Sequence, residues 1–130
     1  MRHFDYVPLG QVLPRAAALV SHGGVGTLSQ ALAAGVPQLV MPLGFDQFDN
    51  AARLERLGVA ATLTPRRFRG PAVAQHLARL LGCPTVARAC QAAAARLRDD
   101  EWEEATCRAV VELTGAGRAA PARRQLARAL

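Results

Sequence analysis

Hydrophobic residues in the first half of the chain fall into short runs, separated by glycine-punctuated segments with helical spacing. Runs of four or five mostly apolar residues are typical of buried strands, whereas apolar residues three and four positions apart indicate one face of a helix. The strands predicted in this way cover residues 17–21, 38–41 and 59–63, and the helices between them cover 27–34 and 50–57. Gly35 and Gly58 stand where these helices should stop. This alternation predicts βαβ units and a parallel sheet.

The second half of the chain has helical spacing throughout. Pro65 and Pro71 bracket a basic loop, and helices are predicted after it over residues 72–81, 84–98 and 101–115. Residues 116–130 are rich in Ala and Arg without a clear apolar face and are predicted to form a frayed tail. One more short strand, residues 4–7, is expected before the others. The prediction is therefore an α/β domain over residues 1–115 with a helical C-terminal extension and a tail over 116–130.

Length and composition favour one folded domain. The 130 residues are 51% hydrophobic and 20% charged, which is long and apolar enough for a real core and argues against intrinsic disorder. No apolar run approaches the roughly 18 residues that span a bilayer. The first residues also lack the apolar segment of a signal peptide. We therefore expect a cytoplasmic protein.

The basic residues are all arginine: 16 Arg, with no Lys and no Ile in the chain. This bias fits a GC-rich bacterial genome. The net charge of +6 falls entirely on residues 66–130, where Arg is scattered at helical spacing. A solvated helix face explains that pattern, so no nucleic-acid partner is expected, although a nucleic-acid or anionic-membrane surface remains the alternative.

The three cysteines suggest neither a zinc site nor a disulfide framework, because Cys83, Cys90 and Cys107 form no C-x-x-C pair and are odd in number. Cys90 and Cys107 are expected to be small apolar helix residues in a reducing compartment.

The segment with the clearest chemistry is Ser-His-Gly-Gly-Val-Gly-Thr, residues 21–27, where a predicted strand meets a predicted helix. Glycines let the backbone approach a ligand, and a helix N-terminus presents free N–H groups and positive charge to an anion such as phosphate. His22 can donate a hydrogen bond to the same anion, and Thr27 can do so or can cap the helix. A tight turn with a structural histidine is the competing interpretation.

Gly24, Gly26 and Ser29 also approximate a dinucleotide-binding fingerprint, with Asp46 as its acidic residue. That fit is poor, because the acid should close the next strand and Asp46 lies five residues beyond Met41.

The ordered segments at residues 7–27, 30–37, 42–47 and 50–51 resemble the donor-binding signature of family 1 nucleotide-sugar glycosyltransferases, which have the GT-B fold. Within that family they are most similar to the bacterial macrolide-type enzymes and to the rhamnosyltransferases of glycolipid synthesis. The resemblance covers about residues 6–58 and continues more weakly over 59–115. It implies a partial Rossmann-like sheet, the C-terminal half of a GT-B donor domain.

The resemblance implies a role for each matching residue. The donor diphosphate would be held by the His22 side chain, the N–H groups of Gly23, Gly24 and Gly26, and the Thr27 hydroxyl. Asp46 and Gln47 match the pair that hydrogen-bonds the hydroxyls of the donor sugar, and a loop that caps the next helix is the alternative for them.

Tyr6 stands where the family usually has a Trp that stacks on the base, and the Val7 backbone would contact the base edge. Gln30 replaces a Glu that accepts hydrogen bonds from both ribose hydroxyls. Since an amide offers one acceptor oxygen, we expect weaker selection for ribose and a better fit to a deoxyribose donor such as a dTDP-sugar. Asp49, Asn50 and Gln11 are interpreted as structural, through helix capping.

The implied reaction is inverting transfer of a hexosyl group from a nucleoside-diphosphate sugar to an acceptor hydroxyl, with no cofactor and no metal. In the family, the base is a histidine oriented by an aspartate in a separate N-terminal acceptor domain, and neither His3 nor His76 fits that role. We therefore expect a fragment with an exposed strand edge that is inactive alone. Its acceptor, a natural product, lipid or sterol, would bind the missing domain, with peripheral membrane contact for a lipid.

Two other functions remain open at this point. The chain can be a non-catalytic nucleotide-sugar binding module or a subunit that a separate chain completes. A different nucleotide-sugar enzyme, such as a sugar epimerase, is disfavoured by the Asp46-Gln47 pair and by the spacing from Pro8 to His22.

Overall fold

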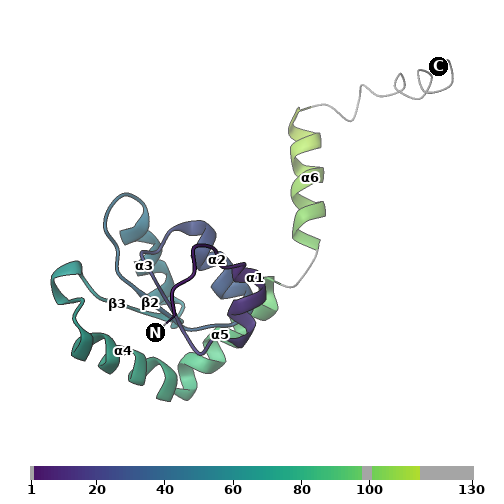
Figure 1. Ribbon diagram of the computed structural model, residues 1–130. Coiled ribbons are helices and arrows are strands. Elements are labelled where there is room, and N and C mark those ends of the chain that lie inside the picture. Colours follow the sequence, from purple (N-terminus) through teal and green to yellow (C-terminus); the bar gives the residue numbers. More distant parts are fainter. Residues whose placement is uncertain (1, 98–100, 115–130) are drawn as a thin grey trace. The chain divides into compact units, whose positions relative to one another are not determined.

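The computed structural model describes residues 2–97 and 101–114 (Figure 1). It divides into two units, Met1–Arg98 and Asp99–Leu130. The first unit holds a parallel sheet with helices on both faces, and the second holds one described helix, α6 (Glu101–Thr114). The predicted tail, residues 116–130, lies outside the described residues, so the proposed boundary after residue 115 stays a prediction.

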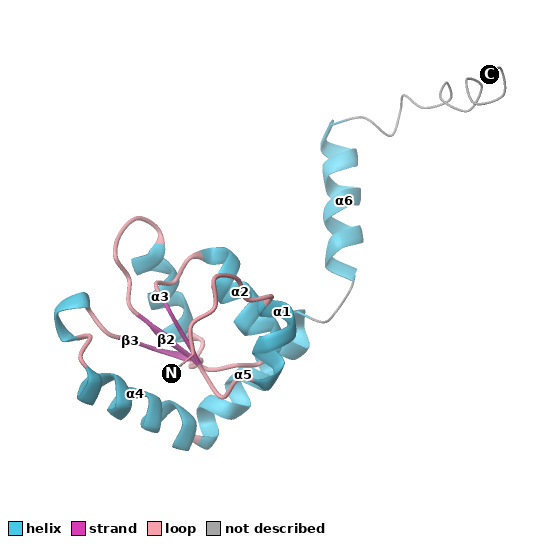
Figure 2. Ribbon diagram, in the orientation of Figure 1, coloured by secondary structure: helices cyan, strands magenta, loops and turns pink. Residues whose placement is uncertain are grey.

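The sheet contains three parallel strands in the order β1-β2-β3, and it confirms the predicted α/β class. Its strands are β1 (Leu19–Ser21), β2 (Gln38–Val40) and β3 (Ala60–Thr62). Helix α2 (Val25–Ala34) connects the first two, and α3 (Gln47–Arg56) connects the second two. Since all strands run the same way, their carboxyl ends and the loops that follow them gather at one edge of the sheet (Figure 2).

The central strand β2 has buried side chains on both faces of the sheet. Val40 belongs to a core cluster with α2, α3 and α5 (Pro84–Leu97), through residues such as Leu54 and Cys90. Leu39 belongs to a separate cluster with Leu63 and with α4 (Gly70–Gly82). This alternation explains why residues 39–41 read as one continuous apolar run.

The N-terminal segment differs from the prediction. Residues 4–7 form no strand, and Phe4 and Tyr6 are exposed, so an isolated extended segment has neither a ladder nor buried area to hold it. Helix α1 (Leu9–Val12) and a 3-10 turn (Leu13–Arg15) follow instead. Buried Leu13 anchors this turn against Ala31 and Val36.

Two helices begin earlier than predicted. Helix α2 starts at Val25 because Gly24, which is extended at φ −66° and ψ 135°, takes the N-cap position. Thr27 is therefore the third residue of the helix, and its interpretation as the N-cap is wrong. Helix α3 starts at Gln47, three residues before the expected start. The basic loop between the two prolines contains a 3-10 turn, Pro65–Arg67.

Strand β1 is an edge strand and is only partly buried, whereas the sequence predicted a buried strand. Within the described residues it pairs with β2 alone, and Val20 at its centre is 42% exposed. The predicted unpaired strand edge is thus present in the described part of the chain.

Both cysteines that were interpreted as helix residues lie on helices, Cys90 on α5 and Cys107 on α6. Cys90 is buried in the core cluster that contains Val40, whereas Cys107 on α6 is exposed. None of the described helices is long and apolar enough to cross a membrane.

Candidate functional site

The glycine loop (residues 22–24) follows β1 and the loop of residues 41–46 follows β2. Because the two strands are parallel, both loops lie at the carboxyl ends of the strands, on the same side of the sheet. Gly23 makes this approach possible: it is buried at φ +89°, and a Cβ atom there would lie 2.8 Å from Val40 Cγ1. That conformation and that space suit glycine alone. The glycine loop therefore lies tightly against the end of β2.

The first amides of α2 divide into satisfied and free groups. Gly23 N–H donates to Ser21 Oγ at 3.2 Å, so this predicted diphosphate donor is already used within the chain. Gly24 O accepts from the N–H groups of Thr27 and Leu28, each at 3.1 Å. The N–H groups of Gly24, Val25 and Gly26 have no hydrogen-bond partner in the described part of the chain. These three are the donors available to an anion at the helix N-terminus.

His22 lies directly over Gly24. Its Nε2 atom is 2.7 Å from the position that a Cβ atom on residue 24 would occupy, and its side chain is exposed. Around Gly26 there is open space, with no atom within 4 Å of the corresponding position. The imidazole and the free N–H groups thus flank an open approach to the helix N-terminus, with half-buried Thr27 in the first turn.

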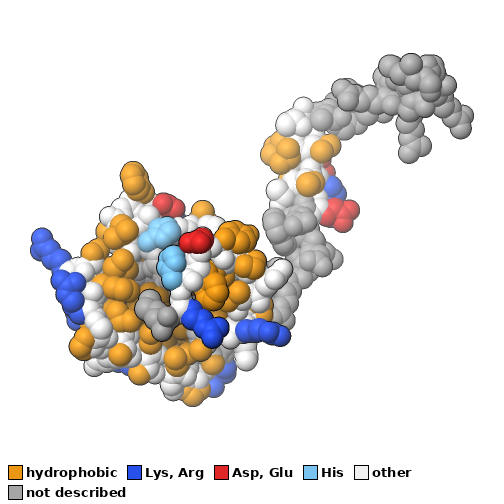
Figure 3. Space-filling model, viewed as in Figure 1, with side chains coloured by type: hydrophobic (Ala, Val, Ile, Leu, Met, Phe, Trp, Pro, Cys, Tyr) orange, Lys and Arg blue, Asp and Glu red, His pale blue; other side chains and the backbone are white. Residues whose placement is uncertain are grey.

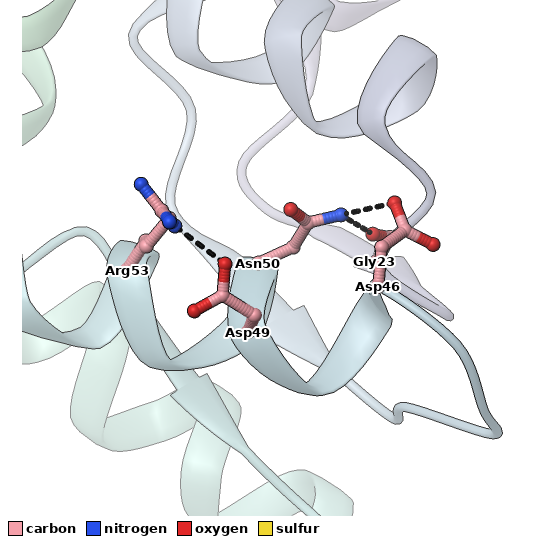
Figure 4. Close-up of polar contacts among 5 residues, drawn as sticks. All are labelled: Gly23, Asp46, Asp49, Asn50 and Arg53. Carbon is pink, nitrogen blue, oxygen red and sulfur yellow. Dashed lines mark hydrogen bonds and ion pairs between the residues drawn. The ribbon is translucent and has the colours of Figure 1, made fainter.

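The start of α3 supplies the second part of the site. Asn50 Nδ2 donates to Gly23 O at 3.0 Å and to Asp46 Oδ2 at 2.9 Å, as Figure 4 shows. Gln47 Oε1 accepts from the N–H groups of Leu43 at 2.8 Å and Gly44 at 3.3 Å. The structure therefore brings Asp46 and the glycine loop together through a side chain.

Asn50 was interpreted as structural through helix capping; its contacts are structural, but Asp46 holds the N-cap position of α3 and Asn50 makes a tertiary contact instead. Its amide makes a contact that spans 27 residues of sequence. Its neighbour Asp49 does have a local role, since Asp49 Oδ2 pairs with Arg53 Nε at 2.6 Å on the exposed surface of α3 (Figure 4). Spacing alone separates these two residues only weakly, because both lie in the first turn of one helix.

Three further predicted residues lie at the periphery. Gln30 is exposed on α2, and its Nε2 donates to Gly26 O at 3.1 Å. Tyr6 is 82% exposed and Val7 is half-buried on the segment before α1. Neither Tyr6 nor Val7 is hydrogen-bonded to the glycine loop within the described residues.

A separate pocket of about 340 Å³ lies against β3 and α4 and includes none of the predicted donor-binding residues. Its lining includes Glu55, Thr62, His76, Arg79 and Cys83. The Thr85 hydroxyl, 2.9 Å from Cys83 Sγ, lowers the pKa of this thiol, with help from the backbone N–H groups of Val86 and Thr85. Burial instead raises the pKa of the Cys90 thiol.

The charged residues form no cluster that indicates a second ligand. The described residues contain no group of three His, Cys, Asp or Glu side chains that could hold a metal ion. On the face shown in Figure 3, the Arg side chains lie at several places on the surface and form no continuous basic patch.

Comparison with known proteins identifies the chain's family. Residues 1–116 match the family described as the erythromycin biosynthesis protein CIII-like C-terminal domain. The chain belongs to this family.

Members of this glycosyltransferase family are similar to the chain over most of its length. It is 41% identical over 111 residues to aklavinone 7-beta-L-rhodosaminyltransferase of Streptomyces galilaeus, covering 85% of the chain and 24% of that protein. It is 35% identical over 124 residues to the 3-alpha-mycarosylerythronolide B desosaminyl transferase of Saccharopolyspora erythraea. That match covers 93% of the chain and 28% of the relative. The chain thus spans about a quarter of the length of these relatives.

A crystal structure of the glycosyltransferase VinC in complex with dTDP shares the fold. The superposition has a TM-score of 0.69 at 34% identity, and it covers 72% of this chain and 24% of VinC. The family and the fold therefore agree: the chain matches a family of C-terminal domains and shares the fold of a solved glycosyltransferase.

Within this family assignment, the sequence missed two features of the site. The first is that Gly23 N–H, which was expected to bind the diphosphate, is already hydrogen-bonded, whereas Val25 N–H is free. The second is that Asn50 connects the glycine loop to the start of α3. The first was hidden because helix capping by Gly24 set the start of α2. The second depends on a tertiary contact.

Proposed function

We propose that this chain is the donor-binding part of a hexosyltransferase that uses a nucleoside-diphosphate sugar. The observation that carries this proposal is the set of free N–H groups on Gly24, Val25 and Gly26 at the start of the ten-residue helix α2, with His22 beside them. Directed amides and the positive end of a helix suit a diphosphate. Since every helix leaves its first N–H groups unpaired, the support lies in the combination of these amides with the adjacent His22 imidazole and an open approach to them.

The donor sugar is proposed to contact Asp46 and Gln47. Asn50 occupies Asp46 Oδ2, which leaves Oδ1 to accept a hydrogen bond from a sugar hydroxyl. The Gln47 carbonyl oxygen is held by two backbone amides, which leaves its Nε2 to donate. A hydroxyl is both donor and acceptor, so this pair matches the hydroxyls of a hexose.

The nucleotide is proposed to be a deoxyribonucleotide such as dTDP. Gln30 Nε2 is engaged by Gly26 O, so the side chain turns its single acceptor oxygen outward. One acceptor serves one ribose hydroxyl well and two poorly. The dTDP bound to VinC supports this choice for a relative of the same fold. Tyr6 and Val7 are proposed to contact the base through stacking and a backbone hydrogen bond.

The reaction is proposed to invert the anomeric carbon without a metal ion or other cofactor. The oxygen of an acceptor hydroxyl attacks the anomeric carbon, and the bond between that carbon and the diphosphate oxygen breaks. A base takes the proton of the acceptor hydroxyl. The charge that grows on the departing diphosphate meets His22, the loop amides and the α2 dipole, which replace a cation. Turnover by a complete enzyme that contains this chain, measured with and without EDTA, tests the absence of a metal.

The base and the acceptor site are proposed to lie in the part of the relatives that this chain does not span. The acceptor is proposed to be a small molecule such as a natural product or a lipid. The free edge of β1 supports completion of the sheet by more polypeptide, whether part of the same protein or a separate subunit.

The decisive experiment measures binding and turnover separately. We expect the 130-residue chain to bind dTDP in calorimetry and to transfer no hexose from dTDP-glucose to any acceptor. If the chain binds neither UDP nor dTDP, the donor-site assignment is rejected. Turnover by the chain alone would reject the proposed location of the base.

A further inference from the structure

Asn50 hydrogen-bonds to both the glycine loop and Asp46. The proposed function assigns the first to the diphosphate and the second to the sugar of one donor. A primary amide has two N–H bonds, and the structure uses both: one reaches Gly23 O and the other reaches Asp46 Oδ2. Figure 4 shows both contacts leaving the amide nitrogen of Asn50. Asn50 is half-buried in the first turn of α3, so its amide is fixed by tertiary contacts.

The contact with Gly23 sets the direction of the next N–H group. In a planar trans peptide, the carbonyl of one residue and the N–H of the next point in opposite directions, and no described peptide bond is cis. Because Asn50 holds the Gly23 carbonyl, the Gly24 N–H points away from Asn50. Gly24 N–H is one of the three free donors at the start of α2. Loss of the amide would therefore release the orientation of a proposed diphosphate donor.

The contact with Asp46 restrains a carboxylate without neutralising it. Asp46 is exposed, and Asn50 is the donor that the structure places on its Oδ2 atom. A neutral amide leaves the negative charge in place, in contrast to an Arg or Lys partner. The other oxygen is left to accept from a sugar hydroxyl, in an orientation that the amide defines.

We propose that Asn50 is a positioning residue that fixes the spacing between the diphosphate donors and the sugar-binding carboxylate. It acts through Gly23 and Asp46 and touches neither part of the ligand. This inference rests on the proposed function, since it takes the glycine loop and Asp46 as parts of one donor site. It adds that the two parts are coupled: one side chain sets affinity for both the diphosphate and the sugar.

The test compares dTDP with dTDP-glucose in calorimetric titrations of the full chain. The ratio of their dissociation constants measures the gain from the sugar. Asn50→Ala is expected to weaken dTDP binding about fivefold to tenfold, the typical effect of one directed hydrogen bond, and to remove the gain from the sugar. Asp46→Ala is expected to remove that gain and leave dTDP affinity unchanged within about twofold.

Asp49→Ala is the matched control, because it removes an exposed ion pair from the same helix turn without touching either loop. We expect it to change neither affinity. The double variant Asn50→Ala with Asp46→Ala should lose no more of the sugar gain than either single variant, because the two residues act as one unit. A general loss of stability would not produce this pattern.

Asn50→Asp provides a second variant of the same size that lacks both donors, and circular dichroism checks that each variant is folded. Asn50 variants that bind both ligands like the wild type, or that keep the sugar gain, would overturn this inference and leave the proposed function intact. If both Asn50 variants fail to fold, the residue is structural and the inference is also overturned. A wild-type chain that binds neither ligand would overturn the proposed function itself, and equal affinities for both ligands would overturn the Asp46 assignment.

Discussion

His22 Nε2 lies 2.7 Å from the place where a Cβ atom on Gly24 would stand, so the imidazole and this glycine occupy the same corner of the site. The backbone of Gly24 is extended at φ −66°, a conformation that any residue can adopt. Glycine at this position therefore leaves room for the imidazole and is not needed for the backbone conformation.

We predict that Gly24→Ala keeps the fold but displaces His22. Its free energy of unfolding should change by less than about 1 kcal/mol, because the exposed ring can move. Its affinity for dTDP should fall about tenfold or more through the loss of a charge-assisted hydrogen bond. Chemical denaturation and calorimetry measure the two effects. Gly26→Ala is the control for stability, because a Cβ atom there meets open space, and a loss of stability in Gly24→Ala far beyond that of Gly26→Ala would contradict this account.

The adjacent glycine should behave differently, because Gly23 is at φ +89° and its Cβ position lies 2.8 Å from the buried Val40 Cγ1. We predict that Gly23→Ala destabilises the chain by about 2–4 kcal/mol, from the left-handed conformation and from overpacking together. Urea unfolding provides the measurement. Measured in a Val40→Ala background, which carries its own cavity cost, Gly23→Ala should lose only the overpacking part of its effect. A Gly23→Ala change that costs nothing in that background would argue against backbone strain.

The sequence predicted the parts of the fold that depend on local pattern. The strand runs at β2 and β3 and the helices from α4 to α6 were predicted to within about two residues, because apolar spacing and proline positions are properties of the local chain. The strand expected at residues 4–7 was wrong, since a strand depends on a partner that local pattern does not reveal. Leu13 was missed for the same reason: its burial follows from Ala31 and Val36, which are distant in sequence.

The candidate site shows the same division. His22 and the glycines could be placed at a helix N-terminus because a strand, a loop and a helix follow one another directly in sequence. Which amides stay free could not be predicted, because Ser21 Oγ captures the Gly23 N–H and Gly24 caps the helix. The role of Asn50 required knowledge of which loop faces the start of α3.

The thiol of Cys83 should be the more reactive of the two cysteines in the first unit. Its pKa is lowered by the Thr85 hydroxyl, whereas burial raises the pKa of Cys90. As pH rises, Cys83 therefore forms thiolate first, and alkylation by iodoacetamide should modify it at a lower pH than Cys90. Mass spectrometry of peptides across a pH series assigns each rate. Thr85→Val should move the pH midpoint for Cys83 upward, and an unchanged midpoint would contradict the role of this hydroxyl.

Gln30 provides the test of nucleotide selection. Gln30→Glu replaces the amide donor with a second acceptor oxygen, so the side chain can no longer donate to Gly26 O and gains a partner for another ribose hydroxyl. We predict that the wild-type chain binds dUDP at least as tightly as UDP, and that Gln30→Glu shifts this ratio about fivefold toward UDP, the effect of one added hydrogen bond. These two ligands differ only in the 2′-hydroxyl, so base contacts at Tyr6 cancel.

Calorimetry on both proteins gives the ratio of the dissociation constants for dUDP and UDP. Ser29→Ala is the control, since the Ser29 hydroxyl donates to Val25 O in the same helix. Tighter binding of UDP by the wild type would show that a single acceptor at residue 30 does not disfavour ribose.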